Sequence, residues 1–146
     1  MTRLLTDAVR DVMDEMVHRG WRYLPDGPDD HWKTVGEFEV DDGNDCEDFA
    51  FYLIVQTGFR DPDARLRMIA GEVYTPRRFG DETLYQVTGH AWVALVDGVE
   101  LWCDPTPGWP KMIASPTQWP RKALWGRNYE PARLAFTDRF AYGDAS

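Results

Sequence analysis

Apolar residues in the first part of the chain recur at the spacing of a helix. From residue 4 to residue 17 they fall on one face, with charged residues between them, which predicts an amphipathic helix that buries that face. A second apolar-periodic segment begins at Cys46 and is predicted to run to about Gln56. Asn44 and Asp45 stand directly before it, and both are strong N-cap residues. Cys46 is therefore predicted to lie in the first turn of a helix.

The second half of the chain has the composition of strands. Residues 66–74 and 83–96 are rich in β-branched and aromatic residues, and residues 75–82 are predicted to form the loop between them. A short strand is expected over residues 99–104. Helices followed by strands in this order predict an α+β fold, with the N-terminal helices packed on an antiparallel sheet.

Beyond the last predicted strand, residues 105–126 are crowded with proline and tryptophan. This composition predicts ordered irregular structure that wraps the domain. Trp109, Trp119 and Trp125 are expected to be buried there, because their rings are too apolar to leave in water.

The turn between the strands at residues 83–96 and 99–104 decides whether His90 and Asp104 can meet. A two-residue turn would place them on opposite faces of the sheet. A three-residue loop that pairs Leu95 with Val99 places His90 directly opposite Asp104 and leaves the other face of the hairpin wholly apolar. Hydrophobic patterning favours the second register. Opposed side chains then have Cβ atoms about 4.5 to 5.5 Å apart, close enough for a carboxylate to orient an imidazole.

Length and charge limit the classes of protein to consider. The chain has 146 residues, which predicts a single domain over residues 1–146. Its net charge of −9 argues against nucleic acid and anionic membrane as partners. No stretch is apolar for long enough to form a signal-peptide core or a membrane span, so a cytoplasmic protein is expected. Two cysteines do not make a disulfide framework, and both are predicted to be thiols.

Three residues could together perform nucleophilic chemistry. The N-terminus of a helix favours the thiolate of Cys46, which is the nucleophilic form of cysteine. His90 could take the thiol proton and return it to a leaving group, while Asp104 fixes the tautomer of the imidazole. Cys103 has no such partners and is expected to pack in the core.

Carboxylates surround this cysteine in the sequence. Asp45, Glu47 and Asp48 would raise the pKa of the thiol, and a bound cation could offset them. Together with the acidic pair at 41–42 they offer the oxygen ligands that calcium prefers, although the spacing is not that of an EF-hand. A solvated helix start, favoured by the helix dipole, explains the same residues without a metal.

These blocks, NDCEDFA, GHAWVAL and WCDPT, resemble in order and spacing the transglutaminase-like superfamily. An upstream D-x-W-x-T-x-x-E, at residues 30–37, is similar to the bacterial transglutaminase-like cysteine proteinases. The resemblance covers roughly residues 8–106 and implies a papain-like core. It implies that Cys46 is the nucleophile, His90 the general base and Asp104 the orienting acid. It also implies calcium ligands at Asp45, Glu47 and Asp48, with no cofactor otherwise required.

The function expected on these grounds is that of a cysteine peptidase or amidase that cleaves a protein or peptide through a thioester on Cys46. A protein-glutamine acyl transferase and a non-catalytic peptide-binding module on the same fold stay open as alternatives. Oxyanion donors are expected from the Cys46 backbone and from Trp32 or Asn44. Trp92 and Trp102 share the face of His90, where they could line the cleft or simply pack.

Overall fold

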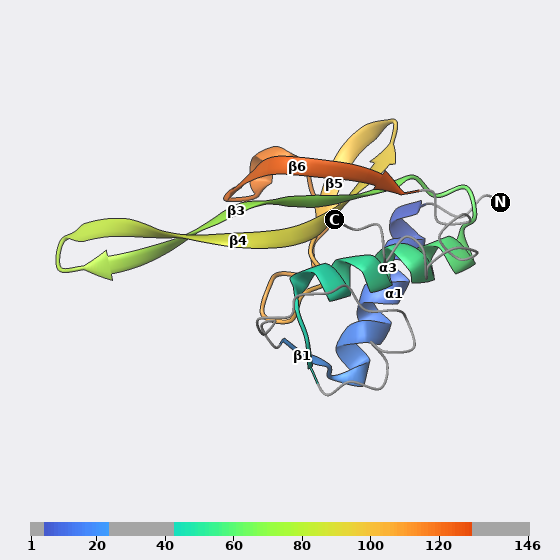
Figure 1. Ribbon diagram of the computed structural model, residues 1–146, viewed down its shortest axis with the longest axis horizontal. Helices are drawn as coiled ribbons and strands as arrows, with labels where there is room; N and C mark the ends of the chain where they lie inside the picture. The colour runs from blue at the N-terminus through green and yellow to red at the C-terminus, as the bar shows by residue number, and fades with distance from the viewer. Residues whose placement is uncertain (1–4, 24–42, 130–146) are drawn as a thin grey trace.

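The structure is a computed structural model that describes residues 5–23 and 43–129. The fold is α+β, as predicted, with two helices and a four-stranded antiparallel sheet in the order β5-β4-β3-β6 (Figure 1). The helices are α1 (Leu5–Arg19) and α3 (Cys46–Arg60), and the strands of the sheet are β3 (Leu66–Phe79), β4 (Glu82–Asp97), β5 (Val99–Cys103) and β6 (Arg121–Tyr129). Neither of these helices has the length and apolar character needed to cross a membrane, among the residues described.

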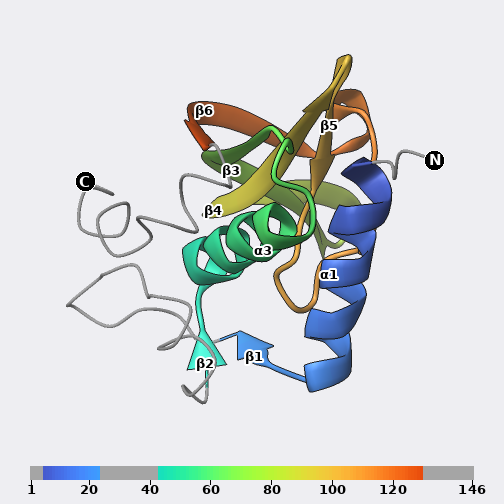
Figure 2. The ribbon, with the colours of Figure 1, turned by 90° about the vertical axis from the view of Figure 1, so that its right-hand side faces the viewer.

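Both helices lie side by side against one face of the sheet (Figure 2). The described part of the apolar stripe on α1 is buried as predicted, except for Val17, which is 57% exposed. Residue 4, where the predicted stripe begins, lies outside the described residues. Two short parallel strands that the sequence did not predict, β1 (Arg22–Tyr23) and β2 (Gly43–Asn44), pair beyond the end of α1 and lead into α3. The helices and the sheet share one core, which includes Val9, Met13, Phe49, Leu53, Ile54, Met68, Val93, Leu95 and Cys103.

A reciprocal cap fixes the start of α3. The Asp48 amide donates to Asp45 Oδ1 at 3.0 Å, and the Asp45 amide donates to Asp48 Oδ2 at 3.2 Å. This capping box confirms the predicted N-cap, and a cap of this kind stabilises a helix by about 1 kcal/mol. The predicted end at Gln56 was wrong by four residues. Thr57 and Gly58 are buried, so the helix continues past them and ends at Arg60.

The β3–β4 hairpin is longer than predicted. Residues 75–82, expected as a loop, belong to the two strands except for Gly80 and Asp81. Gly80 has φ +61, the conformation that a tight two-residue hairpin turn requires at its first position. Pro76 is tolerated because β6 pairs only with residues 66–73, so the proline lies on a free edge of β3. The distal half of the hairpin is exposed and projects from the body as an arm (Figure 1).

The register of β4 with β5 differs from the prediction by two residues. Leu95 pairs with Leu101, not with Val99, so His90 and Asp104 are diagonal neighbours and not directly opposed. A shift of two keeps every side chain on its predicted face, because strands have a period of two. The face toward the helices is apolar as expected, with Ala91, Val93, Leu95 and Cys103 fully buried.

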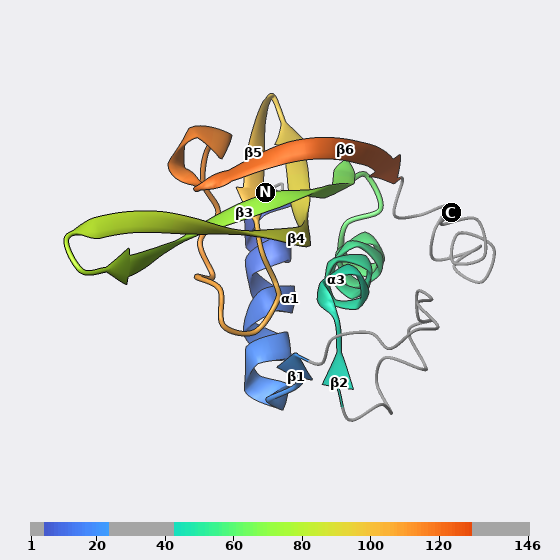
Figure 3. The same cartoon turned by 60° about the vertical axis from the view of Figure 1, so that its left-hand side comes forward.

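The opposite face of the sheet carries a second hydrophobic core, which contains Ile69, Trp92, Ala94, Trp102 and Trp119. The segment that links β5 to β6 (Figure 3) contributes Trp119 to this core and packs Met112 against it. This segment includes a 3₁₀ turn, η1 (Pro116–Gln118).

Strand β6 begins within the stretch that was predicted to be irregular and runs three residues beyond it. Its Trp125 is 44% exposed, contrary to expectation. A bulge in its pairing lies at Ala70 and Gly71, where a Cβ on Gly71 would come within 2.0 Å of the Lys122 carbonyl oxygen. Only glycine fits this approach of β6 to β3.

Candidate active site

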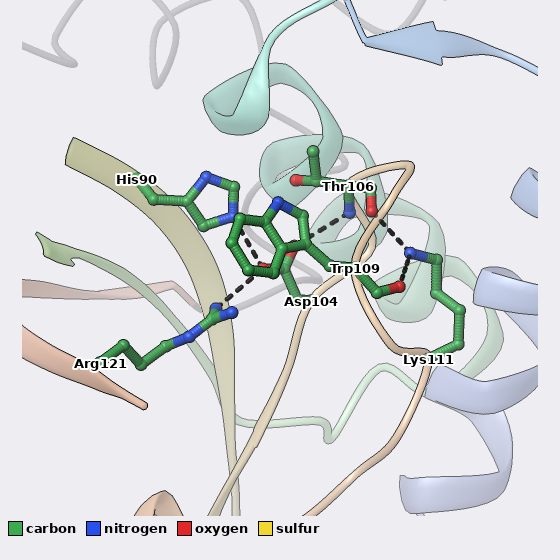
Figure 4. A network of polar contacts seen from close by, with 6 residues as sticks. All are labelled: His90, Asp104, Thr106, Trp109, Lys111 and Arg121. Carbon is green, nitrogen blue, oxygen red and sulfur yellow. Dashed lines mark hydrogen bonds and ion pairs between the residues drawn. The ribbon is translucent and has the colours of Figure 1, made fainter. Parts of the chain in front are cut away.

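His90 and Asp104 lie in contact where β5 ends beside β4. His90 comes from β4, and Asp104 follows the last residue of β5. The imidazole Nε2 and the carboxylate Oδ2 are 2.7 Å apart, and both side chains are buried (Figure 4). The structure therefore brings these two predicted residues together, across a diagonal of the hairpin.

The backbone after Asp104 holds its carboxylate in place. Oδ1 accepts a hydrogen bond from the Thr106 amide at 3.0 Å, which is the Asx-turn geometry that aspartate favours. Lys111 secures this loop from the other side, because its ammonium donates to the carbonyls of Thr106 and Trp109 at 2.6 and 2.7 Å (Figure 4). The ring of Trp109 then lies 5.0 Å from the His90 ring, centroid to centroid. The loop thus orients both members of the pair.

Arg121 is a member of the site that sequence reasoning missed. Its Nη1 donates to the same Asp104 Oδ2 at 2.8 Å, and the side chain is 1% exposed. The guanidinium lies 4.4 to 5.0 Å from the centroids of three indole rings. These rings belong to Trp92, Trp109 and Trp119. Nothing in the local sequence marks this arginine, because its position depends on β6, which was not predicted.

Asp104 is held in its ionised form. Burial alone raises the pKa of this carboxyl, but the hydrogen bond from His90 and the charges of His90 and Arg121 outweigh burial and hold the pKa below its usual value. An ionised Asp104 accepts from Nε2–H, so the other ring nitrogen of His90, Nδ1, is left to face a reaction partner.

Cys46 lies at the first position of α3, beside the His90 segment of β4. The backbone N–H of Ala91, the residue after His90, lies close enough to the Cys46 sulfur to lower the pKa of the thiol. Among the residues described, β5 ends opposite Val93, so the β4 edge has no strand partner at Ala91. The Ala91 N–H on this edge is therefore available to the Cys46 thiol. Cys46 thus lies near the middle of β4, beside the residue that follows His90.

The thiol is protonated at rest. Burial raises the pKa of Cys46 well above its ordinary value, the Glu47 carboxylate adds to the effect, and the Ala91 N–H only partly opposes it. The helix N-terminus was expected to favour the thiolate, but Cys46 is only 7% exposed, and desolvation is the larger effect. A general base is therefore needed to generate the nucleophile.

The carboxylates around Cys46 have a structural use. Asp45 and Asp48 form the capping box of α3, each accepting a backbone N–H from the other. In residues 5–23 and 43–129, no three side chains of His, Cys, Asp or Glu are grouped as a metal would require. The carboxylates of Asp45 and Asp48 are engaged by backbone amides at the start of α3, and carboxylates committed in this way do not fit a calcium site well. The predicted ligand set of Asp45, Glu47 and Asp48 stays a prediction.

The remaining predicted site residues are placed as follows. Trp92 is fully buried and Trp102 nearly so; their rings meet edge to face at 5.1 Å, which is the packing role that the sequence left open. Trp32 and the Asn44 side chain lie outside the described residues.

A cavity of about 310 Å³ lies beside the pair, between the two helices and the loop after β5. Its walls are mostly apolar and include Phe49, Pro105 and Trp109. Phe49 is one turn along α3 from Cys46, Pro105 follows Asp104, and Trp109 contacts His90. Cys46, His90 and Asp104 do not line the cavity themselves, but a residue near or in contact with each of them does.

Comparisons with protein-family models, with curated proteins and with solved structures find no match to this chain. The site is therefore interpreted from its own geometry.

Proposed function

We propose that the protein is a cysteine peptidase or amidase that hydrolyses a protein or peptide amide through a thioester on Cys46. The observation that carries the proposal is the buried 2.7 Å contact of His90 Nε2 with an ionised Asp104, next to a cysteine at a helix N-terminus. This is the nucleophile, base and orienting acid of a thiol hydrolase. The resemblance of the surrounding motifs to transglutaminase-like cysteine proteinases and their papain-like core supports the same reading.

In the first half-reaction, His90 Nδ1 takes the proton of the Cys46 thiol as the sulfur attacks the amide carbon. The C–N bond then breaks, and the imidazolium returns the proton to the leaving amine. Asp104 stabilises the imidazolium between these events and keeps the ring in its tautomer. In the second half-reaction, His90 activates a water that hydrolyses the thioester, which yields the carboxyl product and restores the thiol.

The oxyanion formed in both half-reactions needs hydrogen-bond donors. The first backbone N–H groups of a helix have no partner within that helix, and α3 begins at Cys46. The Cys46 N–H is therefore the proposed donor, and the helix dipole adds to its effect. Trp32 and Asn44 stay predicted contributors.

Two features support an extended peptide as substrate. The edge of β4 that faces away from β3 has no strand partner from Glu82 to Trp92, among the described residues. This edge includes Ala91, whose N–H lies close to the Cys46 thiol. Such an edge can pair with an added strand through backbone hydrogen bonds. The apolar cavity between α1, α3 and the loop after β5 could accept a large apolar side chain of that peptide.

The burial of Cys46 favours a second reading, a peptide-binding module without catalysis. A buried cysteine with a raised pKa is more often a small apolar packing residue than a nucleophile. On this reading the cavity and the free edge of β4 bind a peptide that is not cleaved.

Acyl transfer to an amine uses the same triad as hydrolysis, and it differs only in what reaches the thioester.

Turnover of a mixture of unstructured peptides, followed by mass spectrometry, tests the proposal. We expect new peptide termini with the wild-type protein and none with Cys46→Ala. Cys103→Ala is the matched control and should retain cleavage. Adding a primary amine distinguishes transfer from hydrolysis, because a transferase would give amide products. Peptides that bind but are never cleaved would support the binding module and refute the hydrolase.

A further inference from the structure

Arg121 shares the carboxylate oxygen that orients His90. The two donors approach Asp104 Oδ2 at 2.7 Å from His90 Nε2 and 2.8 Å from Arg121 Nη1 (Figure 4). The triad described above needs only the first of these contacts. A buried guanidinium on the same oxygen alters how much negative charge Asp104 can offer to an imidazolium.

The environment of Arg121 holds its charge at this position. The side chain is 1% exposed, and its Nε has no hydrogen-bond partner among the described residues. Trp119, Trp92 and Trp109 instead surround the guanidinium at 4.4, 4.9 and 5.0 Å. Ring faces stabilise a cation most when water is excluded. The cage therefore keeps one full positive charge against the carboxylate.

We propose that Arg121 is a positioning residue that sets the basicity of His90 by sharing Asp104. With Arg121 present, His90 and Arg121 share the negative charge on Asp104 Oδ2, so less of that charge is left to stabilise an imidazolium at His90. This inference rests on the proposed function for its meaning, but its test does not depend on activity.

Other charged and titratable groups also face this pair. Lys111 comes from the loop after Asp104 and bonds two carbonyls, not the carboxylate. Cys46 of α3 and Cys103 of β5 interact electrostatically with Asp104. Since both thiols are protonated at rest and Lys111 makes no bond to Asp104, Arg121 is the cation whose removal should matter most.

The test is an NMR titration of the histidine ring signals in the full chain. In Arg121→Gln the midpoint of the His90 signals should rise by about one pH unit, because an unshared carboxylate stabilises the imidazolium. His18 on α1 is the internal control and should not move. In an Asp104→Asn background, Arg121→Gln should produce no further shift, since Arg121 acts through Asp104. Arg121→Lys, which keeps the charge, should restore most of the wild-type midpoint.

A folded Arg121→Gln protein whose His90 midpoint stays at the wild-type value would overturn the proposal. If that variant fails to fold, the wild-type protein supplies the test. A caged guanidinium should give resolved, slowly exchanging Nη protons with nuclear Overhauser contacts to Trp119, and averaged signals would overturn the proposal. A shifted midpoint in a protein that cleaves nothing would refute the hydrolase alone and leave this inference standing.

Discussion

The two cysteines of this chain are both buried, but the residues around them differ. Burial raises the pKa of both thiols, and neither forms a disulfide. Cys103 lies in β5 and packs in the apolar core against the helices. Cys46 lies at the start of a helix, and its thiol is close to the backbone N–H of Ala91, the residue after His90 in β4. On the proposed function, Cys46 differs from Cys103 in the groups near it that could take its proton, and the two thiols do not differ in being buried.

The largest expected difference between the two thiols is in activity. Cys46→Ala should abolish peptide cleavage, by at least about 10³-fold, because the sulfur that forms the thioester is gone. Cys103→Ala removes a sulfur from the face of the sheet opposite to His90 and should leave the rate within a few-fold of wild type. The measurement is the initial rate of peptide cleavage at neutral pH. Equal losses in the two variants would contradict the assignment.

In stability the order of the two cysteines should be reversed. Cys103→Ser buries a hydroxyl among apolar side chains and should lower the free energy of unfolding by about 1 to 3 kcal/mol. Cys46→Ser should lower it by less than about 1 kcal/mol, since the Ala91 N–H can donate to the new hydroxyl. Urea unfolding of both variants measures this. A greater loss for Cys46→Ser would show that its thiol is mainly a packing residue.

Alkaline pH should weaken the fold through both thiols. Below about pH 8.5 each thiol is protonated in the folded and the unfolded chain, so neither contributes a pH dependence. Above it the unfolded chain loses these protons while the buried thiols keep theirs, because burial raises their pKa. The free energy of unfolding should therefore fall by about 1.4 kcal/mol per pH unit for each thiol.

Unfolding midpoints measured between about pH 8.5 and 9.5 test this, and the Cys46→Ala and Cys103→Ala variants serve as controls. Each single variant should lose half of the slope. A slope that survives in the double variant would assign the effect to other groups.

The smallest expected effect separates the surroundings of the two thiols. Glu47 raises the pKa of Cys46 but is not among the groups that raise the pKa of Cys103. Glu47→Gln should lower the pKa of Cys46 by less than about one unit, because Glu47 is partly exposed and solvent screens its charge. Iodoacetamide rates against pH, assigned to each cysteine by mass spectrometry, measure the change. A shift at both cysteines, or at neither, would argue against this assignment.

The local parts of the site could be predicted from sequence. The N-cap at Asp45 follows from residue type, and the shared face of His90 and Asp104 follows from the period of two in a strand. The exact pairing did not follow, because a shift of two residues leaves the apolar pattern unchanged.

The contributions that depend on tertiary contacts were not predictable. Strand β6 has no alternating pattern and exists through its pairing with β3, and Arg121 enters the site only through that strand. The flanking carboxylates were expected to raise the pKa of Cys46 and they do, but the largest cause is burial, and the depth of burial cannot be seen in a sequence. Of the tryptophans in residues 105–126, Trp109 and Trp119 surround the guanidinium of Arg121, whereas Trp125 is exposed. Composition alone cannot tell which tryptophan takes which place.

The most direct test of the account is acylation of Cys46 by an activated ester, followed by intact-protein and peptide mass spectrometry. A p-nitrophenyl ester should give a burst of one nitrophenolate per protein, with the acyl group on Cys46 and none on Cys103. His90→Ala should lower the burst rate by about 10²-fold or more, because the neutral thiol then lacks its base. Acylation that is slow, spread over both cysteines and indifferent to His90 would contradict the account and leave a peptide-binding module.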